Sequence, residues 1–453
     1  MVLLQVRSAD ESSPASAEAP YPPPLYAYFL VGVIMVAYTF AFVDRLALSL
    51  VVDPIRHDLG LNDTQVGALA GTAFVVCFVL FSFPFGRWVD QHSRRNAMSV
   101  GVALWSLAMT FSGLANGFWP LFGSRMLIGV GEASINPAAY SIIGDTFPPH
   151  RRTFAMAIYS AGSPVGGGLG VFLGSLLLKW AETHRVTYPL LGKLAPWQVM
   201  FIGMGLPGML VAAWLYLAVR EPARRQVNAS SKGAVPFKDV VAYFVEHRTM
   251  FALIFVGFAG FAINNYGFTV WGPSYFMRVH HLSVAQAGLL LGLGFGVFGT
   301  AGMLVGGLWS DRLIKAGRVE APIWVALPIA GLAIPLFLAA YLSPWTAPAV
   351  VLFCCGMFVA SMIGGVQGAM VQSLAPNRMR GQAAALYLTI ANLIGLGVAP
   401  PLTAMLTDYV FGGRLGIGKA LAVMTVLSMT LASTLIALGM KRARARAQAV
   451  QNS

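Results

Sequence analysis

Long apolar runs alternate with short polar connectors along nearly the whole chain. A helix needs about 20 predominantly apolar residues to cross the hydrocarbon core of a bilayer. The runs therefore predict an all-α integral membrane protein with twelve spanning helices. We expect these helices near residues 26–51, 64–90, 97–115, 119–147, 153–178, 197–219, 249–277, 283–311, 322–342, 346–374, 381–408 and 417–440.

The pattern divides the chain into two similar halves. Gly86 and Asp90 end the second predicted span, and Gly307 and Asp311 end the eighth with the same spacing. Duplicated six-helix halves around a central cavity are typical of transporters. The predicted organisation is a disordered cytoplasmic tail (1–24), a first six-helix half (25–219), a cytoplasmic linker with an interfacial helix (220–248), a second half (249–440) and a basic cytoplasmic tail (441–453).

Composition agrees with a membrane location. The chain is 57% hydrophobic and 10% charged, whereas a soluble domain carries about 25% charged residues. Its formal net charge of +13 is spread over alternate connectors, so it indicates membrane topology and no nucleic acid partner. Because Lys and Arg resist translocation, both termini are expected in the cytoplasm. The expected location is a cell (inner) membrane.

Two acidic residues stand apart by elimination. Asp44 and Glu132 lie well inside predicted spans, whereas the other acids lie in the tail, in connectors or close to helix ends. Arg125 is level with Asp44, and Glu132 follows it by about two helical turns on the same face. Charges at such depth must pair or line a wet cavity. The sequence thus predicts proton-coupling carboxylates at Asp44 and Glu132.

The positions of Asp44, Arg125 and Glu132 indicate how proton binding is coupled to substrate binding. We expect Arg125 to pair with ionised Asp44, and protonation of Asp44 to free Arg125 for an anionic substrate group. Arg45 points about 100° away from Asp44 and is expected to hold helices together. A static ion network is the alternative interpretation of these charges.

The seventh span carries a polar interruption. Asn264, Asn265 and Tyr266 break an aromatic run, followed by Gly267. A locally unwound, cavity-facing segment that contacts substrate is the functional interpretation. An aromatic-rich helix that faces lipid would give the same pattern. The three cysteines lie in apolar runs and give no metal motif, so neither a metal nor a cofactor is expected.

These motifs resemble a known group, the major facilitator superfamily. Its signature after the second span is similar to Gly86, Asp90, Arg94 and Arg95 here, with an echo at Gly307, Asp311 and Arg312 in the second half, and a second signature is similar to Arg125, Gly129 and Gly131. Physically, Gly86 would allow close helix approach and Asp90 could face a helix N-terminus or a loop Arg. The resemblance implies that these residues form a gating motif.

A closer resemblance is to the spinster branch. It is carried by Phe42–Arg45, by Gly129–Ser134 and by the loop Pro148–Arg152. The branch is associated with proton-linked or facilitated export of lysolipids and sphingoid lipids. We therefore expect a monomeric secondary transporter of an amphipathic anion, working by alternating access and coupled to protons.

Two alternatives stay open. A proton symporter of small organic anions fits the same fold and charges. An intramembrane lipid-modifying enzyme would need a base or nucleophile at depth, and all seven histidines fall outside the predicted spans. The sequence thus predicts a transporter rather than an enzyme.

Overall fold

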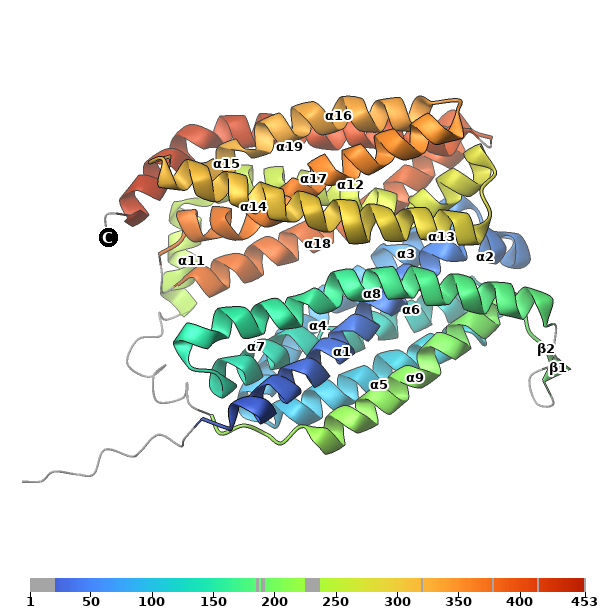
Figure 1. Ribbon diagram of the computed structural model, residues 1–453, viewed down its shortest axis with the longest axis horizontal. Helices are drawn as coiled ribbons and strands as arrows, with labels where there is room; N and C mark the ends of the chain where they lie inside the picture. Colours follow the sequence, from blue (N-terminus) through green and yellow to red (C-terminus); the bar gives the residue numbers. More distant parts are fainter. Residues whose placement is uncertain are drawn as a thin grey trace, which may run out of the picture.

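The computed structural model describes residues 21–184, 187–188, 192–224, 237–318, 321–376, 379–413 and 415–451, and these residues are overwhelmingly helical (Figure 1). The first half contains α1 (Pro24–Leu50), α2 (Val52–Leu59), α3 (Asp63–Ala70), α4 (Thr72–Gln91), α5 (Arg94–Ser112), α6 (Phe118–Glu132), α7 (Ile135–Thr146), α8 (Pro149–Thr183) and α9 (Pro196–Ala218). A two-residue antiparallel hairpin, β1 (Thr187–Tyr188) and β2 (Gly192–Lys193), lies between α8 and α9.

The second half begins after the linker. It contains α11 (Phe237–Glu246), α12 (Arg248–His280), α13 (Val284–Leu293), a π-helical segment (Gly294–Gly299), α14 (Thr300–Lys315), α15 (Ala321–Trp324), α16 (Ala326–Leu342), α17 (Thr346–Leu374), α18 (Arg380–Met405), a second π-helical segment (Leu406–Phe411) and α19 (Gly416–Gln451). Helices therefore stand at every predicted span.

The apolar runs correspond to membrane-crossing helices. Ten helical stretches among the described residues are long and apolar enough to cross a membrane. α5, and α6 with α7, occupy the positions predicted for the third and fourth spans. The all-α membrane fold predicted from the sequence is thus confirmed.

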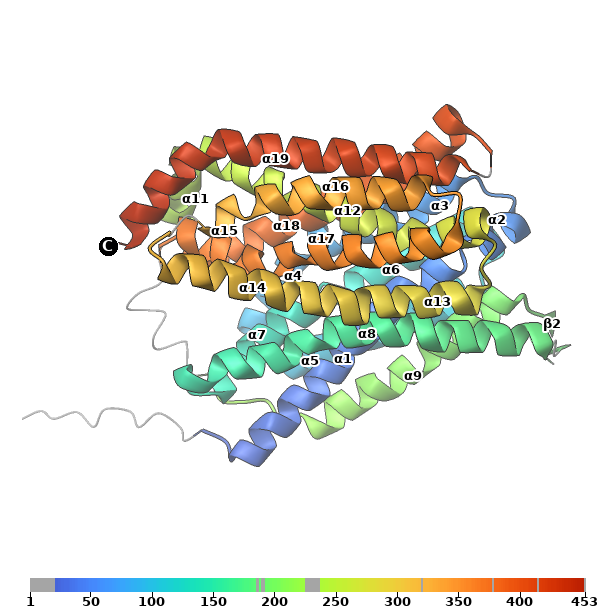
Figure 2. The same ribbon diagram turned by 45° about the horizontal axis from the view of Figure 1, so that its top comes forward.

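The helices form two groups that lie against each other (Figures 1 and 2). One group holds α1–α9, in which α1 packs on α8 and α5 packs on α9. The other holds α12–α19, in which α12 packs on α19 and α18. The groups meet where α3 and α4 contact α18, and where α8 contacts α13.

The two ends of the helix bundle carry different elements, as Figure 1 shows. The hairpin end carries β1, β2 and α2, and the terminal end carries α11 and the C-terminus. The predicted tail at 1–24 lies outside the described residues up to residue 20, and so does the middle of the predicted linker, 225–236. α11 is the helix predicted within that linker, and its Tyr243 hydroxyl donates to the carbonyl of Leu374.

Several predicted spans are divided between two helices, and the break in the fourth lies beside the buried charges. The fourth span breaks into α6 and α7 at Ala133 and Ser134. Pro137 in the first turn of α7 has no N–H to give to the carbonyl of Ala133, which is one cause of the break. The Ser134 hydroxyl also donates to the carbonyl of Gly131 at 2.8 Å. Glu132 is therefore the last residue of α6.

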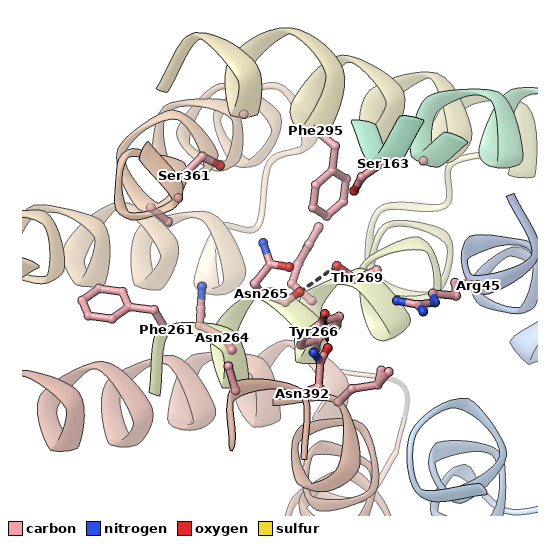
Figure 3. A pocket seen from close by; sticks show the side chains of 18 of the residues that line it. Arg45, Ser163, Phe261, Asn264, Asn265, Tyr266, Thr269, Phe295, Ser361 and Asn392 are labelled. Atoms are coloured by element: carbon pink, nitrogen blue, oxygen red, sulfur yellow. Dashed lines mark hydrogen bonds between the residues drawn. The ribbon is translucent and has the colours of Figure 1, made fainter. Parts of the chain in front are cut away.

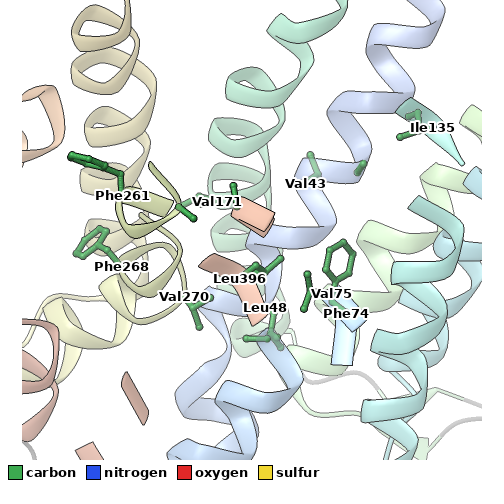
Figure 4. Close-up of a cluster of buried hydrophobic side chains, with 14 of the residues drawn as sticks. Val43, Leu48, Phe74, Val75, Ile135, Val171, Phe261, Phe268, Val270 and Leu396 are labelled. Atoms are coloured by element: carbon green, nitrogen blue, oxygen red, sulfur yellow. The ribbon is translucent and has the colours of Figure 1, made fainter. Parts of the chain in front are cut away.

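The interface between the groups is apolar. Figure 4 shows Val43 and Leu48 of α1, Phe74 and Val75 of α4 and Leu396 of α18 in one buried cluster. Because these side chains come from both groups, their burial contributes to holding the halves together.

Candidate functional site

A cavity of about 450 Å³ lies between the two helix groups. Its walls come from α1, α4, α6 and α8 of the first group and from α12, the Gly294–Gly299 segment, α14, α17 and α18 of the second. Most lining side chains are apolar, including Phe261, Phe268, Phe295, Met303 and Met357. The cavity is therefore mostly apolar, with a small number of polar side chains in its lining.

The charged wall belongs to the first group. Arg45 of α1 and Arg125 of α6 line the cavity. Arg45 pairs with Glu132 of α6, with its Nε and Nη2 at 2.6 Å and 2.5 Å from Oε2. The Glu132 side chain is fully buried, whereas Arg45 keeps 15% of its side chain exposed. This pair joins α1 to α6 at the edge of the cavity.

Aromatic rings complete the surroundings of Arg45. Its guanidinium carbon lies 4.9 Å from the ring centroid of Phe42, 4.8 Å from that of Phe74 and 5.3 Å from that of Phe78. Ring faces carry partial negative charge and stabilise a cation within about 6 Å. Arg45 is thus held by one carboxylate and three rings, consistent with the helix-joining role expected of it.

The pair predicted between Arg125 and ionised Asp44 is not formed in this conformation, and it stays a prediction. Asp44 is buried at 1% exposure and its Oδ1 has no hydrogen-bond partner. Arg125 is buried at 2% exposure; its Nε donates to the carbonyl of Leu69 at 3.4 Å, and its Nη1 has no partner. The two groups are close enough to act on each other electrostatically, yet they form no ion pair. Glu132 takes Arg45 as its partner instead, because both side chains meet between α1 and α6.

The neutral polar wall belongs to the second group. Asn264, Asn265 and Tyr266 of α12 all line the cavity, as predicted (Figure 3). The predicted unwinding is wrong, since α12 is helical from Arg248 to His280. The helix stays intact because its polar side chains face the cavity and α19, where Thr425 donates to Oδ1 of Asn264 at 2.7 Å.

Two further polar residues of α18 were missed from the sequence. The Tyr266 hydroxyl donates to Oδ1 of Asn392 at 2.9 Å, and Nδ2 of Asn392 donates to the carbonyl of Leu388 at 2.8 Å. Tyr387 lines the same wall with a buried hydroxyl. The apolar pattern of the eleventh predicted span gives no reason to place Tyr387 in a cavity.

The predicted gating motif lies at the terminal end. Arg94 of α5 is fully buried and bonds Asp145 of α7, and its Nε donates to Glu221 at 2.7 Å. Glu221 also accepts from the Ser93 hydroxyl and the Arg95 backbone N–H. Partial burial opposes ionisation of Glu221, but these donors outweigh it and hold its pKa below the usual range. The network ties α5, α7 and the segment after α9 together within the first group.

Other members of the motif contribute less. The Asp90 side chain lies outside the described parts of the structure. The close helix approach predicted at Gly86 is wrong, since a Cβ atom there would meet nothing within 4 Å. In the second half a Cβ at Gly307 would make an ordinary contact with α17 at 3.6 Å, and the tight approach falls one residue earlier, at Gly306 against Met362. Asp311 and Arg312 lie exposed near the end of α14.

An ion-pair cluster at the hairpin end was also missed. Arg278, near the end of α12, bonds Asp63 of α3 at 2.6 Å and 2.9 Å and Asp53 of α2 at 2.5 Å. Asp408 accepts from the backbone N–H and hydroxyl of Thr64, both at 2.8 Å. These contacts cross from one helix group to the other. In the sequence each of these charges is an ordinary connector residue, and only the tertiary structure brings them together.

Comparison with known proteins gives the family. The model of the Major Facilitator Superfamily matches residues 34–400. The chain belongs to the Major Facilitator Superfamily. It is therefore a multi-pass membrane transporter, and the same superfamily accounts for the two groups of helices around a cavity.

Individual members of the superfamily refine the comparison. The chain is 27% identical to protein spinster homolog 1 of Xenopus tropicalis over 82% of this chain and 71% of that one. It is 25% identical to a hexuronate transporter of Bacillus subtilis over 88% and 92%. A crystal structure of a bacterial homolog to the human lysosomal transporter spinster, inward-facing and unoccupied, has the same fold, with a TM-score of 0.78 and 24% identity over 95% of this chain and 99% of that one. The predicted spinster resemblance is confirmed.

Proposed function

We propose that this transporter moves an amphipathic anionic lipid, such as a lysophospholipid or sphingoid lipid, by proton-coupled alternating access. The observation that carries the proposal is the cavity, which places the buried Arg125 and the partly buried Arg45 beside a wall of Phe and Met side chains. Arg binds phosphate or carboxylate through its fork of donors. The apolar wall suits an acyl chain, because contact with it removes apolar surface from water.

Asp44 is the proposed proton carrier. Its carboxyl group is buried with Oδ1 unpartnered, and Nη1 of Arg125 is unpartnered as well. This arrangement is the one expected when Asp44 carries a proton, because an ionised carboxylate would pair with the nearby guanidinium. Loss of the proton would then draw Arg125 to Asp44 and release the anionic substrate. Glu132, paired with Arg45, is the second candidate for coupling.

The contacts between the two helix groups support the proposed alternating access. Ion pairs of Arg278 cross the halves at the hairpin end. We propose that this end is closed here and that the terminal end, which carries most of the Arg-rich connectors, faces the cytoplasm. Rocking of the two six-helix halves would then open the hairpin end.

The test measures transport in vesicles reconstituted with purified protein. Movement of a labelled lysophospholipid is compared with and without an imposed pH difference. Wild type is expected to accelerate at least several-fold with the gradient, and Asp44→Asn to lose that acceleration because a neutral amide binds no proton. Asp58→Asn, on α2 at the hairpin end, is the matched control and should respond like wild type. An unchanged gradient response in correctly inserted Asp44→Asn would remove Asp44 from the mechanism.

A second candidate is proton-coupled transport of a small organic anion. The similarity to a hexuronate transporter favours it, since a sugar acid also combines an anionic group with hydroxyls. Uptake of labelled hexuronate into the same vesicles discriminates between the lipid and the small-anion function. Uptake of hexuronate without movement of lysophospholipid would select the small-anion function.

A further inference from the structure

The two walls of the cavity differ in charge. Both charged side chains among the described lining residues are arginines, Arg45 and Arg125, and they come from α1 and α6. The opposite wall, from α12 and α18, presents only neutral polar groups, chiefly Asn265, Tyr266 and Asn392 (Figure 3). A substrate that spans the cavity therefore meets cations on one side and amides or hydroxyls on the other.

One hydroxyl of the neutral wall lacks a partner. Tyr387 is 3% exposed and its Oη forms no hydrogen bond with the described residues. A buried polar group without a partner costs about 1–3 kcal/mol. Several buried polar atoms of the described residues lack a partner, but this one lies in the lining of the cavity, where a bound molecule can complete it. Because Tyr387 lines the cavity, the missing partner would come from the cargo.

The neighbouring amides are arranged to take part. Asn392 is held on both sides, accepting from Tyr266 at 2.9 Å and donating to the carbonyl of Leu388 at 2.8 Å. Having donated its proton, the Tyr266 hydroxyl keeps acceptor capacity. Asn265 exposes its side chain in the cavity, and within the described chain no hydrogen bond to that amide is seen. The wall thus presents both donors and acceptors, as a hydroxyl group requires.

The cavity lining as a whole is unsuited to a cationic substrate group. None of the described residues that line the cavity is Asp or Glu, and the two carboxylates nearest to the arginines, Asp44 and Glu132, stand behind the lining. A cationic amine in the cavity would face Arg125, which forms no ion pair with a described residue, whereas Arg45 is already paired with Glu132. The lining therefore selects against substrates that carry a positive group.

We infer that Tyr387 and Asn265 form a hydroxyl-recognition subsite, so that the cargo has an anionic head group with free hydroxyls and no cationic amine. The anionic group binds at Arg125 and the hydroxyls at the α12–α18 wall. This inference rests on the proposed function and narrows its substrate class, from lysophospholipids and sphingoid lipids in general to hydroxylated anionic ones. A sugar acid shares the same chemistry without the acyl chain.

The experiment uses three lysolipids with the same acyl chain: lysophosphatidylglycerol, lysophosphatidic acid and lysophosphatidylcholine. Wild type in reconstituted vesicles is expected to move the first fastest, because its glycerol hydroxyls reach the neutral wall, and the third slowest, because it carries a cation. Tyr387→Phe and Asn265→Ala are each expected to slow lysophosphatidylglycerol about fivefold relative to lysophosphatidic acid, the loss that one hydrogen bond accounts for. Tyr409→Phe, on a 70% exposed tyrosine, is the matched control and leaves the ratio unchanged.

Stability and binding measurements keep the test decisive. Tyr387→Phe removes an unpartnered hydroxyl, so the detergent-solubilised variant should melt no lower than wild type. Lysophosphatidylglycerol should raise the melting temperature of wild type more than lysophosphatidic acid does, and Tyr387→Phe should abolish the difference. Equal head-group preference in wild type and both variants, or lysophosphatidylcholine moving as fast as lysophosphatidylglycerol, would overturn the subsite. Hexuronate uptake without lysolipid movement, weakened by Tyr387→Phe, would refute the lipid cargo and support the subsite.

Discussion

At the scale of single residues, the charges in the centre of the molecule are held by unequal means. Glu132 is fully buried with one cationic partner, Arg45, which also contacts three aromatic rings. Asp44 and Arg125 are equally deep, but neither forms an ion pair with a described residue; Oδ1 of Asp44, Nη1 of Arg125 and Oε1 of Glu132 each lack a hydrogen-bond partner. Removing one member of a buried ion pair leaves the other charge uncompensated, and this costs more than the pair itself contributes. We therefore interpret Arg45 and Glu132 as a structural ion pair, and Asp44 and Arg125 as the groups available for coupling.

Glu132→Gln tests the structural pair. We expect the free energy of unfolding to fall by about 2–3 kcal/mol, slightly less than for a fully buried pair, because Arg45 keeps contact with the cavity and with ring faces. The melting temperature in detergent measures the loss. Adding Arg45→Met should restore much of the stability, since no lone charge remains, and a double variant that melts no higher than Glu132→Gln contradicts this account.

At the scale of elements, close helix packing depends on a few glycines. A Cβ atom at Gly129 of α6 would collide with the carbonyl oxygen of Phe74 in α4. Gly123, six residues earlier in the same helix, has nothing within 4 Å. The α4–α6 contact holds the helix that carries Arg125 at the cavity and Glu132 behind its lining, so its spacing matters for the site. Membrane helices use glycine in this way because small residues let their backbones approach.

Gly129→Ala is expected to destabilise the protein by about 1–3 kcal/mol, the usual cost of overpacking. Gly123→Ala is the matched control and should be neutral or stabilising by up to about 1 kcal/mol, because alanine loses less backbone freedom on folding. Melting temperatures of both variants in detergent give the comparison. Equal melting of the two variants would mean that α4 and α6 do not pack as tightly as their backbones indicate.

At the scale of the whole molecule, the halves are joined by different chemistry at different depths. Apolar side chains join them in the middle, and ion pairs join them at the hairpin end. Arg278 bridges from α12 to both α2 and α3. Arg56 also reaches Asp63, at 3.3 Å, but it comes from α2 and so stays within the first half. Among the described residues, the ion pairs that join the halves at this end are those of Arg278, and the hydrogen bonds from Thr64 to Asp408 also cross here.

Arg278→Gln is therefore expected to shift the population toward conformations open at the hairpin end. Spin labels on cysteines introduced at His57 and Tyr409, after replacement of the native cysteines, report the distance across this end. The distance distribution should broaden toward longer values in Arg278→Gln and stay close to that of wild type in Arg56→Gln. If both variants broaden equally, general loss of charge explains the effect rather than the bridge between halves.

Much of this protein was determined by the sequence alone. The apolar runs set the fold class and the helix positions, because the hydrocarbon core requires internally bonded, apolar segments of a fixed length. Elimination among the acids located Asp44 and Glu132, because charges at depth are too costly to occur without a role. The signature residues also indicated the superfamily before any contact was known.

Only the tertiary structure decided which charges meet. Glu132 pairs with Arg45 rather than with Arg125. The neutral wall is assembled from α12 and α18, and Arg278 meets Asp53 and Asp63. Each of these contacts joins residues that are far apart in the chain. These outcomes depend on the rotation of each helix about its axis and on the angle at which it crosses its neighbours. Side-chain packing over whole helix faces sets both quantities, and no local pattern of hydrophobic and polar positions contains them.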